Sequence, residues 1–319
     1  MSGPAAPVPD TPSRARLPPV LLAGPTAVGK SAVALQLTER LGGEIVSVDS
    51  MQVYRGLDLG TAKPSPEERA RVPHHGVDVV DLSESFDAAR FVAMANAAIG
   101  AIQSRGRVPI LCGGTGLYFN AWLGGLGEAP APDPALRMAI EALTTAALVE
   151  ELARQDPVTL EEMDLQNRRR LVRAVEVIRL TGRPFSQQRA RWPDPAPALA
   201  GRSFGLIRDR EDLVGRMDAR VEAMFRSGLV DEVRALIPKG LASNRTASQA
   251  IGYRQVLEHL EGPRSLIETR EIVKIRTRQF AKRQLTWFRG QLDLDWISVP
   301  PQEDPASTAA RILRRLAME

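Results

Sequence analysis

Between residues 24 and 31 the chain reads Gly24-Pro25-Thr26-Ala27-Val28-Gly29-Lys30-Ser31. This run fits the phosphate-loop pattern, in which a glycine and four further residues precede Gly-Lys-Ser/Thr. The apolar run Val20-Leu21-Leu22 predicts a buried strand before it, and residues 31–41 predict a helix after it that ends at Gly42-Gly43. Such a loop directs backbone N–H groups at one point and binds an anion there. The stretch therefore predicts an α/β fold, a P-loop NTPase-like parallel sheet flanked by helices, with a site for a di- or triphosphate.

Three side chains near the loop are candidates for chemistry. Lys30 adds a positive charge at the anion site, and the hydroxyl of Ser31 can hold Mg²⁺. A second predicted strand, residues 44–48, ends at Asp49. In an open parallel sheet ligands bind beyond the carboxyl ends of the strands, so we expect Asp49 to face the same crevice as the loop. A helix cap is the alternative for a single carboxylate, but this position favours a chemical role.

The rest of the sheet is predicted from short apolar runs. Strands are expected at residues 77–80, 107–111 and 204–207, and a helix at 86–104. The glycine-rich turn 113–116 follows the strand at 107–111 and would let the backbone approach a ligand closely.

That strand lacks the acidic residue with which many phosphate-loop ATPases hold Mg²⁺, because it ends at Cys112-Gly113 instead. The chain also lacks the guanine-reading Asn-Lys-x-Asp. Both absences count against a motor ATPase and a regulatory GTPase.

Composition divides the chain. Residues 1–17 are rich in Pro, Ala and Ser and predict a disordered tail. Two proline-rich linkers, 128–134 and 193–197, enclose about 60 residues of helical pattern. We therefore expect a core domain from residues 18–130 and 195–319, with a small all-helical domain of residues 131–194 inserted into it.

Composition also limits the class of protein. Of 319 residues, 44% are hydrophobic and 25% are charged, as in soluble globular proteins. No segment approaches the ~18 apolar residues that a membrane span requires. The single cysteine, Cys112, excludes an internal disulfide and fits a reducing cytoplasm. His74 and His75 are adjacent, which is poor spacing for zinc ligands, so a structural role is expected.

Positive charge is concentrated in two segments. Residues 168–191 hold eight arginines and one acid, Glu176, and residues 264–290 hold eight basic residues and two acids. Two such patches, in a chain whose net charge is only +4, indicate a nucleic-acid partner. On the predicted helix 269–290, Lys274, Arg278 and Lys282 form one stripe.

The predicted helix 212–225 carries Arg216 and Arg220 one turn apart. Solvated arginines are one interpretation; a clamp on an anionic leaving group is the other. The residues alone thus indicate a phosphate-loop transferase with a nucleic-acid partner, and a small-molecule kinase would rank first among enzymes.

Several motifs together resemble one family, the bacterial tRNA dimethylallyltransferases, which modify the adenine on the 3′ side of the anticodon. The resemblance runs from about residue 20 to 300 and is specific as an ordered set. Its motifs are Gly-Pro-Thr-Ala-Val-Gly-Lys-Ser (24–31), Ile-Val-Ser-Val-Asp-Ser-Met-Gln-Val-Tyr-Arg-Gly (45–56), Gly-Thr-Ala-Lys-Pro (60–64), Gly-Gly-Thr-Gly-Leu-Tyr (113–118), Arg-Leu-Val-Arg-Ala (170–174), Ile-Gly-Tyr-Arg (251–254) and Thr-Arg-Gln-Phe-Ala-Lys-Arg-Gln-Leu-Thr-Trp-Phe-Arg (277–289).

The resemblance implies that the loop binds the diphosphate of dimethylallyl diphosphate rather than ATP, with Mg²⁺ as cofactor held partly by Ser31. We expect Asp49 to act as general base on the adenine amine, and Thr26 to orient the diphosphate or the amine. Lys30, Arg216 and Arg220 would stabilise the leaving diphosphate.

The resemblance also implies a set of tRNA contacts, with the helical insert on the anticodon stem-loop. These residues are Asp49, Ser50, Met51, Gln52, Thr115, Arg137, Arg169, Arg170, Leu171, Val172, Arg173, Gln249, Ala250, Ile251, Gly252, Tyr253 and Arg254. We expect a monomer with no membrane partner.

Three alternatives stay open. An adenylate isopentenyltransferase acting on free AMP, ADP or ATP would share the loop and Asp49 but would not need two basic patches. A small-molecule kinase would use the loop for ATP and Asp49 to activate a hydroxyl. A nucleotide-gated RNA-binding protein is weakened by the missing carboxylate after residues 107–111.

Overall fold

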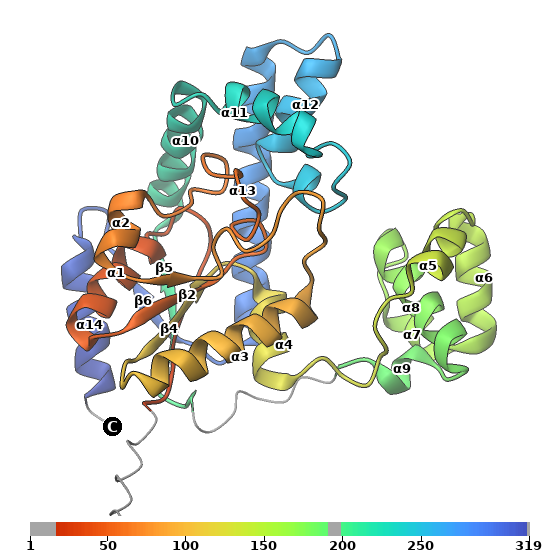
Figure 1. Ribbon diagram of the computed structural model, residues 1–319, viewed down its shortest axis with the longest axis horizontal. Coiled ribbons are helices and arrows are strands. Elements are labelled where there is room, and N and C mark those ends of the chain that lie inside the picture. The colour runs from red at the N-terminus through yellow and green to blue at the C-terminus, as the bar shows by residue number, and fades with distance from the viewer. Residues whose placement is uncertain (1–16, 191–198, 318–319) are drawn as a thin grey trace, which may run out of the picture. The chain divides into compact units, whose positions relative to one another are not determined.

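Six parallel strands form one sheet in the order β3-β2-β4-β1-β5-β6 (Figure 1). The computed structural model describes residues 17–190 and 199–317, so nearly all of the predicted tail and the whole linker 193–197 lie outside the described residues. The strands are β1 (Val20–Ala23), β2 (Glu44–Val48), β3 (His74–His75), β4 (Pro109–Gly113), β5 (Ser203–Ile207) and β6 (Asp295–Ser298).

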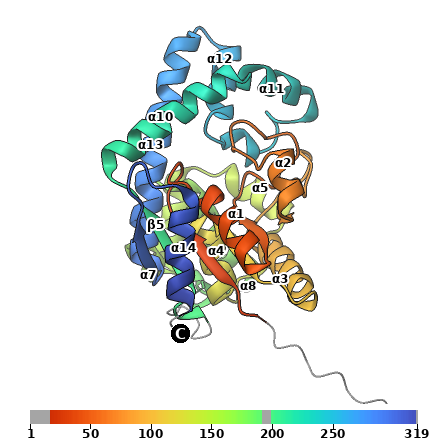
Figure 2. The same cartoon turned by 90° about the vertical axis from the view of Figure 1, so that its left-hand side faces the viewer.

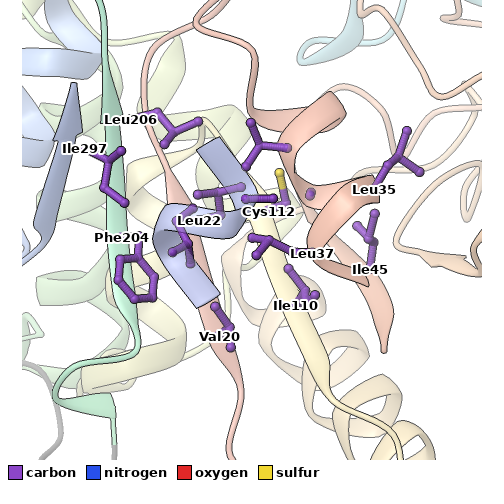
Figure 3. Packing of buried hydrophobic residues seen from close by; sticks show 14 of the residues in the cluster. Val20, Leu22, Leu35, Leu37, Ile45, Ile110, Cys112, Phe204, Leu206 and Ile297 are labelled. Carbon is purple, nitrogen blue, oxygen red and sulfur yellow. The ribbon is translucent and has the colours of Figure 1, made fainter. Parts of the chain in front are cut away.

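One face of the sheet is covered by the helix after the phosphate loop and by the last helix of the chain. Helix α1 (Lys30–Leu41) and helix α14 (Pro305–Leu316) pack against each other and share one hydrophobic core with the strands (Figure 1). Figure 3 shows this core, in which Leu22, Leu37 and Phe204 are fully buried. The central strands β1 and β4 are buried along their whole length without alternation, because helices cover both faces of the sheet.

The other face packs against helix α3 (Ala88–Ser104), whose Phe91 and Ile102 are fully buried. Tyr118, in helix α4 (Gly116–Gly124), stacks on Phe91 with ring centroids 4.4 Å apart. Between β2 and β3 the chain forms the short helix α2 (Pro66–Arg71), which begins with a capping box at Ser65.

Four helices follow β5 and stand beyond the sheet: α10 (Arg210–Arg226), α11 (Leu229–Leu236), α12 (Tyr253–Glu261) and α13 (Leu266–Gln291). The 3-10 turns η2 (Ile237–Lys239) and η3 (Ala247–Gln249) connect α11 to α12. Helices α10 and α13 lie side by side (Figure 2).

The predicted basic stripe on α13 is largely neutralised by α10. Lys274 pairs with Glu222 at 2.7 Å and also with Glu271, and Arg278 pairs with Asp218. Two of the three stripe residues therefore join helices rather than facing a partner as free charges.

The inserted helices form a second compact unit, residues 119–196. Its helices are α5 (Pro134–Glu141), α6 (Thr145–Gln155), α7 (Pro157–Glu162), α8 (Arg168–Thr181) and α9 (Phe185–Gln188). The core contains Leu148, Leu171 and Val175, all fully buried. The unit begins inside α4, not at residue 131, because proline content marks where the chain is extended whereas the division follows packing.

One predicted strand is misplaced and one strand was missed. The strand expected at residues 77–80 lies instead at His74–His75, and Val80 forms only an isolated bridge with Tyr54. Gly76 and Asp78 both have positive φ (77° and 55°), which bends the backbone out of the extended form. The edge strand β6 was not predicted. The two histidines have structural roles: His75 bonds to the buried Glu44 and His74 to the Val72 carbonyl.

Among residues 17–190 and 199–317, no helix is both long enough and apolar enough to span a membrane.

Candidate active site

The carboxyl ends of four neighbouring strands bring the site together. Gly24 follows β1, Asp49 follows β2, Gly114 follows β4 and Arg208 follows β5 by one residue. Because the strands are parallel, these ends meet at the same edge of the sheet. Both Asp49 and the phosphate loop therefore belong to one site.

The phosphate loop has a strained, left-handed backbone. Ala27 has φ 64°, and Gly29, the N-cap residue of α1, has φ 107°. Alternation between right- and left-handed residues forms the concave N–H arrangement that binds anions, and α1 adds its positive dipole end.

Cationic side chains hold the carbonyl oxygens of this loop. Lys30 Nζ donates to the carbonyl of Pro25 at 2.8 Å, and Arg216 Nε donates to that of Ala27 at 2.9 Å. Arg208 Nε donates to the carbonyl of Val28 at 2.8 Å. A Cβ added to Gly29 would lie 3.7 Å from Arg208 and 4.0 Å from Arg216. The loop is thus surrounded by positive charge even without a ligand.

Arg220 NH1 donates to the Thr26 hydroxyl at 3.1 Å. Four of the five predicted catalytic residues, Thr26, Lys30, Arg216 and Arg220, therefore belong to the loop or bond to it. The fifth, Asp49, makes no direct contact with these four and interacts with Lys30 and Arg220 through charge. Burial lowers the pKa of Lys30 to about 8; Cys112 and Asp49 oppose this shift and Arg220 adds to it. Burial also lowers the pKa of Arg220, which Asp49 opposes, and raises that of the Cys112 thiol to about 11.

Asp49 forms a tight turn at the end of β2. Its Oδ1 accepts hydrogen bonds from the N–H groups of Met51 at 2.8 Å and Gln52 at 3.2 Å. Within residues 17–190 and 199–317 both side-chain hydrogen bonds of Asp49 are accepted by Oδ1, which leaves Oδ2 to accept a substrate proton. The turn is an Asx type, in which a carboxylate bonds backbone two residues on. Asp49 thus uses Oδ1 to hold the turn of residues 49–52 and leaves Oδ2 for a substrate.

Arg208 was not among the sequence-predicted residues, although the rule that selected Asp49 would have found it, since both follow strands. Gln284 of α13 was also missed as a site residue. It accepts a hydrogen bond from Thr26 N–H at 2.9 Å and donates one to the Gly114 carbonyl at 2.8 Å. Its sequence separation from Thr26 leaves no local signal for this contact.

The glycines of the turn 113–116 are required by close packing within the protein itself. A Cβ at Gly113 would lie 2.0 Å from the Val48 carbonyl oxygen, and one at Gly116 would lie 2.1 Å from the Trp287 ring. These glycines allow the protein's own β2 and α13 to approach the turn.

The residues present fit Mg²⁺ as a partner of a bound diphosphate. Ser31 is exposed in the first turn of α1 and lines a small cavity of about 30 Å³ with Ser47 and Gln52. In the described ranges 17–190 and 199–317, no group of three His, Cys, Asp or Glu could hold a metal ion. Mg²⁺ commonly takes one or two protein ligands, with phosphate oxygens and water completing its octahedron.

The predicted tRNA contacts in the core domain are mixed. Thr115 and Gln52 are partly exposed near Asp49, and Arg254 is exposed and bonds Glu258 and Gln249. Tyr253 is fully buried; its hydroxyl donates to Glu232 and accepts from Gly60 N–H at 3.2 Å. The Tyr253 ring is therefore core and not available to RNA.

In the helical unit the predicted contacts also divide. Arg169 and Arg170 are exposed at the start of α8, whereas the side chains of Leu171 and Val172 lie in the helical core. Leu171 and Val172, the fourth and fifth residues of α8, face inward, so the predicted contact of these positions with tRNA does not involve exposed side chains.

Arg137 of α5 and Arg173 of α8 converge on one buried carboxylate. Both donate to Glu176 Oε2 at 2.7 Å, and the Glu176 side chain is 0% exposed while the arginines are 32% and 26% exposed. In the sequence analysis Glu176 entered only as the one acid of a basic segment. In the structure it holds the side chains of two residues that are predicted to bind tRNA.

Three further arginines of this basic segment are also paired: Arg179 with Glu151, Arg183 with Glu128, and Arg189 with Glu162. The patch is therefore less positive toward a partner than the sequence count implies.

Comparisons with known proteins identify the family. The family model described as IPP transferase matches residues 52–291. The chain is 49% identical over 287 residues to the tRNA dimethylallyltransferase of Halorhodospira halophila, covering 86% of this chain and 91% of that one. It is 45% identical to that of Geobacter sulfurreducens, covering 91% and 95%.

Solved structures give the same result. The tRNA isopentenylpyrophosphate transferase of Bacillus halodurans matches with a TM-score of 0.67 at 37% identity, over 94% of this chain and 96% of that one. A eukaryotic dimethylallyltransferase acting on tRNA matches with a TM-score of 0.73 at 26% identity, over 92% and 76%. With the family model covering most of the chain and relatives this similar, the chain belongs to the IPP transferase family.

Proposed function

We propose that this protein transfers a dimethylallyl group from dimethylallyl diphosphate to N6 of the adenine at position 37 of tRNA, 3′ to the anticodon, and releases diphosphate. The observation that carries the proposal is the Asp49 carboxylate at the same sheet edge as a phosphate loop held by Lys30, Arg208 and Arg216. The names of the relatives and the tRNA-acting structural neighbour support it.

The reaction is a substitution at the allylic carbon. The N6 lone pair forms the new C–N bond while the bond from that carbon to the diphosphate oxygen breaks. The proton that N6 loses passes to Asp49 Oδ2, because Oδ1 already accepts from Met51 and Gln52. A carboxylate held in this way keeps its orientation as the amine approaches.

The leaving diphosphate gains negative charge as the bond breaks. Loop N–H groups, Lys30, Arg216 and Arg220 stabilise that charge, and Thr26 is oriented by Arg220 to contact the diphosphate. When bound, Mg²⁺ neutralises part of the diphosphate charge, with Ser31 as its protein ligand. Burial of Lys30 and Arg220 strengthens each interaction, since the local dielectric is low.

The tRNA contacts use both units. In the core domain, the partly exposed Gln52 and Thr115 lie in turns that follow strands, where binding residues concentrate on a rigid scaffold. The exposed Gln249 and Arg254 lie in η3 and at the start of α12. Arg137, Arg169, Arg170 and Arg173 of the helical unit bind the anticodon stem-loop. The target base leaves its stack to enter the site, as it must for chemistry at N6. We propose that the enzyme acts as a monomer in the cytoplasm.

The test uses purified protein, Mg²⁺, radiolabelled dimethylallyl diphosphate and total tRNA from a strain lacking this modification, with AMP and ATP as parallel acceptors. Label in acid-precipitated tRNA alone is the expected result. Label in AMP or ATP would favour an adenylate isopentenyltransferase. Phosphate transfer from ATP without prenyl transfer would favour a kinase.

A further inference from the structure

Gln284 of α13 connects two loops at the sheet edge. Its Oε1 accepts from Thr26 N–H at 2.9 Å and its Nε2 donates to the Gly114 carbonyl at 2.8 Å. The residue is only 8% exposed, so water competes little for either bond. A single amide side chain therefore joins the phosphate loop to the turn after β4.

The turn after β4 in turn holds both peptide groups that flank Asp49. Thr115 N–H donates to the Val48 carbonyl at 3.1 Å, and Ser50 N–H donates to Thr115 Oγ1 at 3.1 Å. A Cβ at Gly114 would lie 2.4 Å from Gln284 Nε2, so this close approach depends on glycine. A shift of the turn would carry Asp49 with it.

Helix α13 is itself fixed to the helix that carries the two arginines of the site. Arg278 pairs with Asp218 and Lys274 pairs with Glu222 at 2.7 Å, both acids lying in α10. Arg220 of α10 and Gln284 of α13 then meet at Thr26, one on its hydroxyl and the other on its N–H. The position of Thr26 is thus set from both helices.

We propose that Gln284 is a positioning residue that sets the separation between the bound diphosphate and the Asp49 carboxylate. The inference rests on the proposed function, because it assigns the diphosphate and the base to the two loops that Gln284 joins. The substitution requires N6, the allylic carbon and the leaving oxygen in line, with the base within hydrogen-bond reach of N6. A misplacement of ~1 Å costs on the order of 100-fold in rate.

The test compares Gln284→Met with Gln291→Met, a glutamine at the exposed end of the same helix. Methionine keeps the length and apolar volume of Gln284 but makes neither hydrogen bond. In single-turnover reactions we expect Gln284→Met to lower the rate constant about 10- to 100-fold, with the product amplitude and the tRNA dissociation constant unchanged. Gln291→Met should match the wild type. Gln284→Asn, which is too short to span both partners, gives the same measurement if Gln284→Met does not fold.

A second measurement asks whether Gln284 acts through the base. In an Asp49→Asn background, Gln284→Met should change the residual rate less than about threefold, since two residues coupled through a shared backbone shift have effects that do not add. A full effect in that background would overturn the proposal. So would a normal rate constant with a reduced amplitude, which is the result of a merely structural role.

The two proposals fail separately. No label in tRNA with the wild-type enzyme would remove the proposed function before any variant is compared. Normal wild-type transfer together with normal Gln284→Met kinetics would remove only the assignment of Gln284.

Discussion

Arg220 and Thr26 are joined by a hydrogen bond of 3.1 Å between a guanidinium NH1 and a hydroxyl, across 194 positions of sequence. The bond brings a partly buried cation from α10 to the middle of the phosphate loop. It also fixes the Thr26 hydroxyl, whose rotation would otherwise be free. Two residues that the sequence suggested for separate roles therefore form one unit.

The first prediction concerns that unit. Arg220→Ala should lower kcat about 100-fold, because it removes a cation from the leaving diphosphate and frees Thr26. Thr26→Val should cost less, about tenfold, and the double variant should match Arg220→Ala, since the threonine acts through the arginine. Steady-state kinetics of the four proteins measures the coupling; strictly additive losses would show that the two residues act independently.

The second prediction follows from the lowered pKa of Lys30. With a pKa of about 8, the free ammonium is mostly charged at pH 7 and mostly neutral at pH 9. Bound diphosphate favours the charged form and raises the pKa. Binding at pH 9 should therefore take up about one proton, and binding at pH 7 very little. Calorimetry in two buffers with different ionisation enthalpies measures the uptake. Lys30→Arg, which stays charged throughout, should show none.

The same shift predicts an effect on stability. The pKa of Lys30 is about 8 in the folded protein against an ordinary 10.5, so between these values the unfolded chain binds more protons. The contribution of Lys30 to the free energy of unfolding should then rise with pH across that window. Ligand-free Lys30→Met should unfold at a higher temperature than the wild type at pH 7.5, with the difference shrinking toward pH 10. A constant difference would mean that packing, not charge, is responsible.

The third prediction concerns the base. Asp49→Asn keeps an oxygen that accepts the Met51 and Gln52 N–H groups, so the turn is retained. It loses proton acceptance, and kcat should fall about 10²- to 10⁴-fold while the tRNA dissociation constant changes less than twofold. Parallel loss of turnover and tRNA binding would argue against Asp49 as the base. Ser85→Ala, an exposed change remote from this sheet edge in the chain, serves as the control.

Local patterns were enough to predict part of this site. The phosphate loop, Asp49 and four of the six strands follow from glycine spacing, short apolar runs and the rule that ligands bind at the carboxyl ends of parallel strands. A fifth strand, expected at 77–80, was misplaced because the positive φ of Asp78 has no composition signal.

Contacts between distant segments could not be predicted in the same way. Lys274 and Arg278 looked like free charges because their acids, Glu222 and Asp218, lie on another helix. Nothing in the sequence around Gln284 distinguishes it from other polar residues of a basic helix; its role is seen only from its hydrogen bond with Thr26. Pairing of side chains between helices depends on tertiary packing. A single sequence therefore predicts which charges lie in a segment, but not which of them are neutralised by a neighbouring helix.

The fourth prediction separates a core residue from a ligand. Tyr253 is fully buried and its hydroxyl joins Glu232 to Gly60. Tyr253→Phe should lower the free energy of unfolding by about 1–2 kcal/mol, since the hydrogen bond from its hydroxyl to the partly buried Glu232 is lost. The tRNA dissociation constant should change less than twofold, whereas Arg254→Ala, which removes an exposed cation, should weaken binding. Denaturant titration measures the free energy of unfolding, and filter binding measures the tRNA dissociation constant. A large loss of tRNA affinity in Tyr253→Phe would mean that Tyr253 contacts the RNA.

The last prediction concerns Glu176, which holds Arg137 and Arg173 in the helical unit. Glu176→Gln keeps the shape and one acceptor but removes the charge that fixes both guanidinium groups. The arginines then sample more rotamers, and ordering each again on binding costs about 0.5–1.5 kcal/mol, so tRNA affinity should fall about tenfold.

Glu151→Gln is the matched control for this change. Glu151 is 7% exposed and pairs with Arg179 in the same unit, but Arg179 is not a predicted tRNA ligand. Both variants remove a buried carboxylate charge and should destabilise the unit by a similar amount. Only Glu176→Gln should weaken tRNA binding when affinities are compared at one salt concentration, because phosphate contacts depend on salt. Equal affinity losses in the two variants would mean that stability of the unit, rather than placement of Arg137 and Arg173, determines how tightly the RNA is held.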